Sequence, residues 1–238
     1  MFFFRKREKK MPFVSAVIAA SGSSTRMGGE NKLLMEIGEQ SVLAHTLLAF
    51  QNCSMISEIV IAARGDMIIP YSNLATELGI DKLKVVVAGG KTRCESVYAG
   101  ARQVSDRADY IAVHDGARPL IRPEEIVSVC EKAFTYTAAA AAVPVKDTIK
   151  IVEDGRISET VDRSRLWAMQ TPQVADRALL MSALKNAIDQ NLNATDECMA
   201  LEAIHVKPAI VMCSYENIKI TTPEDVLFAR AILAQREE

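Results

Sequence analysis

The sequence lacks an excess of either charge sign and lacks a long apolar run. Its 28 Lys and Arg residues stand against 30 Asp and Glu residues, so the formal net charge is −2. Because no basic surplus exists to hold a polyanionic backbone, nucleic acid is not expected as a partner. No apolar stretch approaches the roughly 20 residues of a membrane span, so no membrane partner is expected either.

Cysteines are few, and none has the spacing of a paired cysteine. No CxxC element is present, which argues against a zinc site and against a disulfide framework. Isolated thiols are typical of proteins in a reducing compartment, so we expect a cytoplasmic protein. The five cysteines are Cys53, Cys94, Cys130, Cys198 and Cys213.

Two common nucleotide-binding motifs are also missing. No GxxxxGK run followed by Ser or Thr is present, which disfavours a Walker loop. After Gly22 the residues Ser23, Ser24 and Thr25 omit the second glycine of a dinucleotide fingerprint, and the second predicted strand is followed by Arg64 where that fold carries an acid. Any nucleotide must therefore be held in another way.

Short apolar runs alternate with longer amphipathic stretches, in a chain with 49% apolar and 24% charged residues. This alternation predicts an α/β fold with a Rossmann-like, mostly parallel sheet and helices on both faces. Ser41 and Asp66 are the expected N-caps of two helices. The expected strands are Val14–Ala20, Glu58–Ala63, Lys84–Ala88, Tyr110–His114, Ala138–Val145 and Ala209–Cys213. The expected helices are Val42–Asn52, Met67–Leu78, Arg93–Val104, Glu124–Tyr136, Arg177–Gln190, Thr195–Ile204 and Pro223–Gln235.

The alternation predicts a tail at 1–12 and a single domain at 13–238, from which a β-arm of about 146–170 protrudes. Within the arm, two short strands flank an Asp154-Gly155 turn and read as a hairpin with polar residues on both faces. A hairpin with little apolar face is not stable alone in water. A second subunit is a good candidate for the surface that supports it.

The loop after the first strand contains Ala20, Ser21 and Gly22, with Arg26 and Lys32 close behind. Small residues let backbone N–H groups approach a polyphosphate, and the two cations balance part of its charge. The alternative is a flexible loop with solvated cations. We interpret this loop as a binding site for a triphosphate.

Other strands also end in residues suited to a nucleotide. Gly89 and Gly90 clear space for a planar or phosphate ligand, and Ser96 lies one helical turn further on. Asp115 ends another strand and can hold Mg²⁺, or another hard divalent cation, through one carboxylate. Arg118 is a structural partner for Asp115, whereas His114 is read as a packed strand residue.

Together these pieces resemble the 2-C-methyl-D-erythritol 4-phosphate cytidylyltransferase family of the non-mevalonate isoprenoid pathway. They occur in the order of that family and span nearly all of residues 13–235. The matching pieces are Ala20 to Lys32, Gly89 to Val97, His114 to Pro119, Val143 to Thr148, Arg163 with Leu166 to Gln173, Thr195 to Glu197, and Asn217 to Asp225.

The resemblance implies a nucleotidyltransferase-type fold and an enzyme that transfers CMP from CTP to the phosphate of methylerythritol phosphate, releasing pyrophosphate. It implies a homodimer whose β-arm reaches the partner's site, and Mg²⁺ on Asp115. The implied catalytic residues are Arg26, Lys32 and Lys219. The implied nucleotide contacts are Ala20, Ser21, Gly22, Gly89, Gly90, Ser96 and Gly116. The implied substrate contacts are Thr148, Arg163, Thr171 and Thr195.

The sequence departs from the family at a few positions. Ser21 and Ser24 stand where many members carry glycine or alanine, Asn31 where proline is frequent, and Lys91 where some members carry an acid. Two alternatives stay open at this point. One is a cytidylyltransferase for the small polyol phosphate ribitol 5-phosphate, and the other is a non-catalytic nucleotide sensor.

Overall fold

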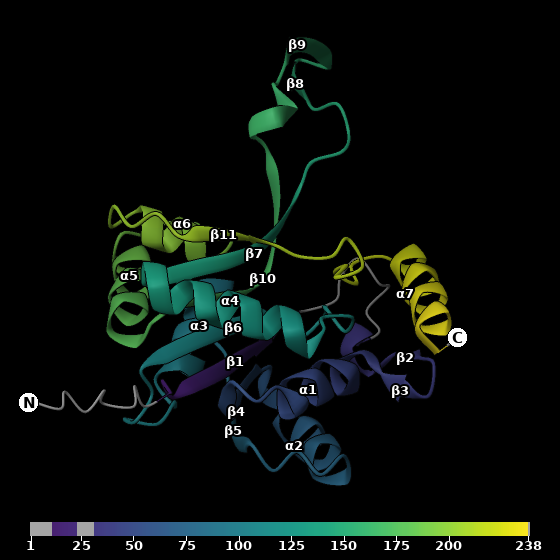
Figure 1. Cartoon of the computed structure of the whole chain (residues 1–238), viewed down its shortest axis with the longest axis vertical. Coiled ribbons are helices and arrows are strands. Elements are labelled where there is room, and N and C mark those ends of the chain that lie inside the picture. Colours follow the sequence, from purple (N-terminus) through teal and green to yellow (C-terminus); the bar gives the residue numbers. More distant parts are fainter. Residues whose placement is uncertain (1–10, 23–30, 238) are drawn as a thin grey trace, which may run out of the picture.

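A seven-stranded sheet forms the centre of this computed structural model, which describes residues 11–22 and 31–237 (Figure 1). All of its strands are parallel except β10, which runs antiparallel to both neighbours. The predicted α/β class with a mostly parallel sheet is confirmed. In order across the sheet, the strands are β11 (Ala209–Met212), β7 (Ala138–Pro144), β10 (Trp167–Asp176), β6 (Tyr110–Asp115), β1 (Val14–Ala20), β4 (Ile56–Ala63) and β5 (Leu83–Ala88).

The central strands are buried on both faces, as expected of strands covered by helices on either side. In β1, Val14, Ala16 and Ile18 contribute to the apolar cluster on one face, whereas Val17 contributes to the cluster on the other. Successive side chains of a strand alternate between faces, so a run that is apolar except for Ser15 serves both clusters. This explains why these strands have no polar alternation.

Helices pack in both apolar clusters, in agreement with the predicted helices on both faces of the sheet: three helices together with the last helix of the chain in the first cluster, and three in the second. The first set is α1 (Val42–Asn52), α2 (Ile68–Glu77) and α4 (Pro123–Tyr136), and the second is α3 (Arg93–Ala101), α5 (Arg177–Asp189) and α6 (Glu197–Glu202). The last helix, α7 (Pro223–Glu237), lies beside a small hairpin of β2 (Glu36–Ile37) and β3 (Gln40–Ser41) (Figure 1). Short 3₁₀ turns are η2 (Lys32–Leu34), η3 (Gly65–Met67) and η4 (Arg163–Arg165).

Of the two predicted helix caps, one is confirmed and one is wrong. The Ser41 side chain accepts a hydrogen bond from the Ala44 N–H at the start of α1. Asp66 does not cap α2, because the chain first makes the 3₁₀ turn η3 and the helix begins only at Ile68. The Asp66 carboxylate instead pairs with Arg64 at 2.7 Å.

β10 is absent from the strands expected from the sequence, although it lies between β7 and β6 in the sheet. This strand carries Gln170, Thr171, Pro172 and Gln173, and proline normally argues against a central strand. The pairing with β7 is interrupted between Met169 and Gln173, so Pro172 lies where the two strands do not form a regular hydrogen-bond ladder. An irregularity of this kind accommodates a proline that a continuous ladder would reject.

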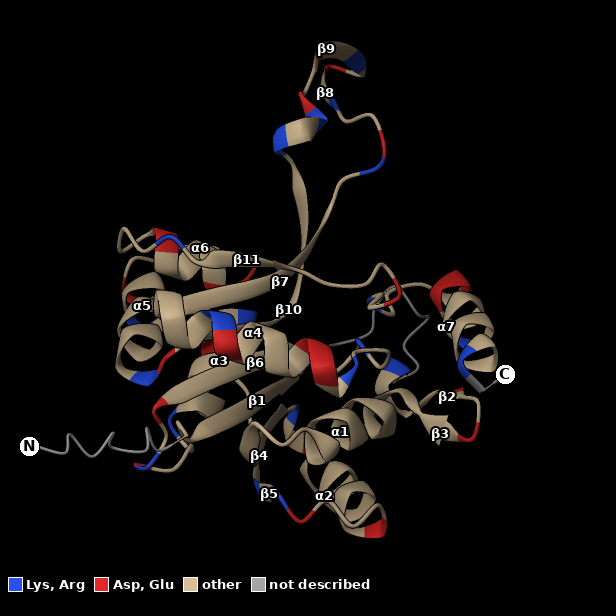
Figure 2. Cartoon of the chain, in the orientation of Figure 1, with Lys and Arg blue, Asp and Glu red and all other residues tan. Residues whose placement is uncertain are grey.

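The predicted arm is present and extends away from the sheet between β7 and β10 (Figures 1 and 2). It occupies 145–166, so its predicted end at about 170 falls within β10. Its hairpin consists of β8 (Lys150–Glu153) and β9 (Arg156–Thr160), joined through Asp154 and Gly155 at φ 50° and 75°. Two consecutive positive φ values are typical of the tight turn that suits a twisted hairpin.

The arm is less polar than the sequence analysis predicts. Ile151, Val152 and Ile157 are 43%, 57% and 66% exposed, and Val152 lies opposite Ile157 in the hairpin. Exposed apolar side chains on a two-stranded hairpin need a surface to cover them. The arm therefore presents both charge and apolar area to whatever contacts it.

No helix in the described part of the chain is long and apolar enough to cross a membrane.

All five cysteine thiols are free and buried. Burial raises the pKa of each thiol above its ordinary value. High-pKa buried thiols are poor nucleophiles and poor metal ligands, so these cysteines act as core residues.

Candidate active site

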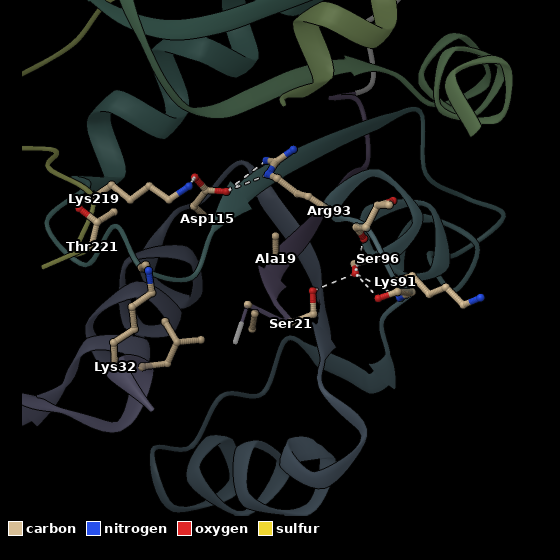
Figure 3. Close-up of a pocket in the computed structure, with 15 residues that line it drawn as sticks. Ala19, Ser21, Lys32, Lys91, Arg93, Ser96, Asp115, Lys219 and Thr221 are labelled. Atoms are coloured by element: carbon tan, nitrogen blue, oxygen red, sulfur yellow. Dashed lines mark hydrogen bonds and ion pairs between the residues drawn. The ribbon is translucent and has the colours of Figure 1, made fainter. Parts of the chain in front are cut away.

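A cavity of 420 Å³ lies where β1, β5 and β6 end (Figure 3). Lys32, Lys219 and Thr221 lie on one side of it, and Ser21, Ser96 and Lys91 lie on the other. Ligands of open α/β sheets bind at this end of the strands. The lining includes these residues predicted from the sequence: Ala20, Ser21, Gly22, Lys32, Gly90, Ser96, Asp115 and Lys219.

Other predicted residues lie near the cavity without lining it. Gly89 precedes the lining residue Gly90, and Gly116 is buried with its N–H bonded to the Ala19 carbonyl. Thr171 is only 3% exposed and lies beneath Asp115, whose backbone N–H donates to the Thr171 hydroxyl. The Thr171 hydroxyl thus holds the backbone of Asp115, and its predicted contact with the substrate stays a prediction.

The remaining predicted residues lie further away or outside the described residues. Thr195 is exposed in the loop that precedes α6. Thr148 and Arg163 lie on the arm, where Arg163 donates to the Lys146 carbonyl at 2.6 Å. None of the arm residues 145–166 lines this cavity. Arg26 falls within 23–30, outside the residues that the structure describes.

A tight turn around Ser96 forms one wall of the cavity. The Ser96 hydroxyl accepts from the Gly90 N–H at 3.1 Å and donates to the Thr92 carbonyl at 2.8 Å. Ser21 donates to the same oxygen at 2.8 Å, which connects the first loop to this turn (Figure 3). A capping box between Thr92 and Glu95 fixes the start of α3.

Gly90 is required here for steric reasons. A Cβ placed on Gly90 would lie 2.3 Å from the Cβ of Glu95, a distance that cannot be tolerated without movement of the turn. We expect Gly90→Ala to displace the wall and to raise the KM for the nucleotide by about one order of magnitude, which corresponds to about 1.4 kcal/mol of lost binding free energy from misplaced contact groups. Steady-state kinetics with varied nucleotide measures this.

Gly65→Ala is the matched control, because nothing lies within 4 Å of a Cβ at that exposed position. We expect the control to keep the kinetics of the original chain. An unchanged KM in Gly90→Ala would show that the turn adapts and that Gly90 plays no part in shaping the wall.

Asp115 is surrounded by three cationic side chains. Its Oδ1 accepts from the Arg93 guanidinium at 3.1 Å, and its Oδ2 lies 2.8 Å from Lys219 Nζ and 3.8 Å from Arg118 Nε (Figure 3). Burial alone would raise the pKa of Asp115, but Arg93, Lys219 and Arg118 hold it well below its usual range. Asp115 is therefore a carboxylate throughout the neutral range, and its expected pairing with Arg118 is confirmed.

Arg93 is a cavity residue to which the sequence analysis gave no role. Its guanidinium contacts Asp115 on one side and the buried Glu197 on the other. A signal existed in the sequence, because Arg93 is the third residue after the Gly89–Gly90 pair and begins a predicted helix. Its acidic partners, however, lie 22 and 104 residues away, and no spacing rule connects them.

His114 is fully buried and does not face the cavity. Its ring nitrogens contact the Thr171 hydroxyl at 3.0 Å and the Arg118 carbonyl at 3.1 Å. Burial lowers the pKa of His114 to about 4, so the imidazole is neutral at pH 7. A neutral, enclosed ring bonded on both nitrogens cannot exchange protons with a ligand, in agreement with its predicted structural role.

The segment carrying Lys219 is held against the cavity by its neighbours. Arg118 donates to the Asn217 carbonyl at 2.7 Å, and the Thr221 N–H and hydroxyl both donate to Asp225 at 2.7 Å. Lys32 reaches the same segment by donating to the Ile220 carbonyl at 2.7 Å. Two cationic side chains from opposite ends of the chain therefore meet on one side of the cavity.

The donor set in the cavity suits a hard cation only in part. Within the described residues, no group of three or more His, Cys, Asp or Glu side chains is arranged to hold a metal ion. Asp115 is the one carboxylate among the described lining residues, and it is ionised. Because Mg²⁺ commonly binds one or two carboxylates together with substrate phosphates, Asp115 fits such an ion when phosphates complete the site.

Comparison with known proteins supports the resemblance seen in the sequence. The family model of 2-C-methyl-D-erythritol 4-phosphate cytidylyltransferase matches residues 14–235. A protein of that name from Halalkalibacterium halodurans is 44% identical over 224 residues, covering 94% of this chain and 98% of the relative. Another from Desulforamulus reducens is 39% identical over 226 residues, covering 94% and 97%.

Solved structures agree with the sequence comparison. The crystal structure of 4-diphosphocytidyl-2C-methyl-D-erythritol synthase from Anaerococcus prevotii superposes with a TM-score of 0.84 at 29% identity, covering 94% of this chain and 96% of that one. The cytidylyltransferase from Thermus thermophilus gives 0.77 at 28% identity, covering 92% and 98%. These matches cover nearly the full length of this chain and of each relative, so the similarity extends over the whole fold. The chain belongs to the 2-C-methyl-D-erythritol 4-phosphate cytidylyltransferase family.

Proposed function

We propose that this cavity binds CTP and that the chain transfers the CMP group to the phosphate of 2-C-methyl-D-erythritol 4-phosphate. The proposal rests on the charged residues that line the cavity at the carboxyl ends of the strands: Lys32, Lys219, Arg93 and Asp115. The chain that carries them belongs to this family. A substrate phosphate oxygen forms a bond to the α-phosphorus, the bond from that phosphorus to the bridging oxygen of the β-phosphate breaks, and pyrophosphate leaves.

The two sides of the cavity bind different parts of the nucleotide. The cationic side, with Lys32 and Lys219, suits the triphosphate, and Arg26 is proposed to join them. The side formed by Gly90 and Ser96 suits the base and the ribose, because a glycine turn and a small hydroxyl leave room for a flat ring. Lys219 then lies where negative charge develops at the α-phosphorus, and stabilising that charge lowers the barrier.

No general base is needed for this reaction. The attacking phosphate has a second pKa near 6 and is already ionised at neutral pH. In agreement with this, His114 is enclosed and neutral, and Asp115 is occupied by its cationic partners. The chemistry reduces to positioning the two phosphates and to stabilising charge.

We also propose Mg²⁺ as the cofactor, held by Asp115 together with phosphate oxygens of CTP. A bound Mg²⁺ would neutralise triphosphate charge and favour departure of pyrophosphate. Asp115 would hold the ion through its carboxylate, and Lys219, its neighbour at 2.8 Å, would bind phosphate oxygens beside it. Calorimetric titration of Mg²⁺ in the presence of CTP tests whether the ion binds there.

The proposed substrates are tested by a pyrophosphate-release assay. We expect CTP to give a much higher kcat/KM than ATP or GTP, because the Gly90 turn leaves space for a small base. We expect methylerythritol phosphate to be used in preference to ribitol 5-phosphate. Comparable rates with a purine nucleotide would overturn the base preference, ribitol 5-phosphate as the better acceptor would identify the sister activity, and CTP binding without turnover would identify a sensor.

We propose that two chains form a homodimer in which each arm completes the partner's site. Thr148 and Arg163 are exposed on the arm, outside the cavity of their own chain. Ile151, Val152 and Ile157 supply uncovered apolar area for the contact. Arg163 would then meet the phosphate of the acceptor substrate, and Thr171 and Thr195 stay proposed contacts of that substrate from the chain's own body.

The compartment proposed for this chain is the reducing cytoplasm. Its five thiols are free, whereas a chain exposed to an oxidising environment commonly uses such residues in disulfides. The thiols are also buried, so each one serves as an ordinary small apolar residue of the core.

A further inference from the structure

A buried acid outside the cavity holds one of the cavity's cations. Glu197 has a side chain that is only 1% exposed, and it binds the Arg93 guanidinium with both oxygens, at 2.6 Å and 3.1 Å. Glu197 does not line the cavity and therefore cannot contact a ligand there. Whatever it does for the reaction must act through Arg93.

The position of Glu197 is itself fixed from the sheet. Gln173 of β10 donates to Asp196 at 3.0 Å and accepts from the Cys198 N–H at 2.9 Å, so it binds the residues on either side of Glu197. Asp196 also caps the first turn of α6. These contacts place a carboxylate, on the first residue of a short helix, directly against a guanidinium of α3.

Arg93 connects Glu197 to the cavity. The same guanidinium that binds Glu197 donates through Nε and Nη2 to one oxygen of Asp115, at 3.3 Å and 3.1 Å. That leaves the other oxygen of Asp115 directed at Lys219, 2.8 Å away (Figure 3). Glu197, Arg93, Asp115 and Lys219 thus form an alternating series of charges that ends beside the proposed position of the α-phosphate.

Stability alone does not explain a buried carboxylate at this position. A buried ion pair is often no more stabilising than apolar side chains of similar volume, because both charges lose their hydration. A planar, two-point contact does, however, fix the orientation of a guanidinium better than any apolar packing. The two-point geometry at Glu197 therefore indicates a role in orienting Arg93.

We propose that Glu197 is a positioning residue for the transfer reaction, which holds Arg93 against Asp115 and keeps it from binding the triphosphate. The inference rests on the proposed function of the cavity. Without Glu197, the Arg93 guanidinium would keep Asp115 as its one acidic partner beside the proposed position of the phosphates. It would turn toward the phosphates, tighten nucleotide binding and leave Asp115, and with it Lys219, less firmly oriented.

The test uses Glu197→Gln, which keeps the shape of the side chain and removes its charge. We expect kcat to fall about 10- to 100-fold, as for other residues that orient a directly acting group, while the KM for CTP stays the same or decreases. Glu202→Gln is the matched control, because Glu202 ends the same helix and is exposed. We expect the control to leave both constants unchanged. A rise in KM with unchanged kcat, or no change in either constant, would overturn the proposal.

A double variant separates positioning from loss of folding. Arg93→Met combined with Glu197→Met removes both buried charges and leaves no unpaired ion. If Glu197 acts through Arg93, the double variant has the kcat of Arg93→Met alone. A further loss in the double variant, multiplying that of Arg93→Met, would mean that Glu197 acts independently. Absence of turnover in the unaltered chain would instead contradict the proposed function, so the two failures are distinguishable.

Discussion

Asp115→Asn is expected to lower kcat by about two to three orders of magnitude, because it removes the carboxylate around which the cations of the cavity are arranged. Arg93, Lys219 and Arg118 all face this group, at 3.1, 2.8 and 3.8 Å. An asparagine amide cannot accept from three cations, nor can it bind a hard cation as a carboxylate does. Both the orientation of Lys219 and the proposed Mg²⁺ contact are lost together.

Two measurements distinguish these consequences. The Mg²⁺ dependence of the residual activity reports on the metal contact, and we expect the variant to require a higher Mg²⁺ concentration for half-maximal rate. Asp66→Asn is the control, since Asp66 is exposed and pairs with Arg64 away from the cavity. Near-normal kcat in Asp115→Asn, with the melting temperature preserved, would remove Asp115 from the reaction.

The parts of the fold that sequence reasoning placed well are those with one dominant local signal. The strand Val14–Ala20 and the helix Val42–Asn52 begin and end where expected. The strand is apolar except for Ser15, and the helix starts at a serine cap. Where the local signal fits the tertiary environment, no knowledge of distant contacts is required.

Strand β10 shows the opposite case. Its polar residues are buried because distant groups satisfy them. Gln170 donates to the Ser214 carbonyl, and Gln173 binds Asp196 and the Cys198 N–H. These partners lie 23 to 44 residues away, so nothing in the local pattern marks Gln170 or Gln173 as interior. Tertiary hydrogen bonding overrides local strand propensity here.

The site residues also differ in whether a local sequence signal or a distant contact places them. Ser21, Lys32 and Asp115 follow predicted strands, and topology alone places the ends of parallel strands together. Lys219 had no such signal and reaches the cavity because Arg118 binds the Asn217 carbonyl, 99 residues away in the chain. Its proposed role came from the family resemblance. Glu197 matched a family motif, but only the structure shows that it binds Arg93.

The arm leads to the prediction with the clearest all-or-none outcome. Lys32 lines the cavity, whereas Arg163 lies on the arm outside that cavity. In the proposed homodimer, each complete site draws Lys32 from one chain and Arg163 from the other. Lys32→Ala and Arg163→Ala should each lose most of their activity alone. For Arg163, loss of a charged contact to phosphate costs about 1.5–3 kcal/mol, or roughly one to two decades in kcat/KM.

Mixing the two variants under conditions that allow subunits to exchange should restore activity. A heterodimer then contains one site with both substitutions and one site with neither. Random mixing makes half of the dimers heterodimers, so we expect about a quarter of the original activity. Pyrophosphate release measures the recovery, and sedimentation of a size-tagged mixture measures the exchange.

A second mixture makes the test specific to the arm. Lys32→Ala mixed with Asp115→Asn damages the cavity of both chains, so every site in every dimer keeps one defect. This mixture should stay inactive although subunits exchange as before. Recovery in both mixtures would mean that something other than the arm restores the sites. Failure of the first mixture despite proven exchange would place Arg163 at its own chain's site or at none. Recovery in the first mixture alone requires that the arm crosses, because only a crossed arm brings an unaltered Arg163 to a cavity that retains Lys32.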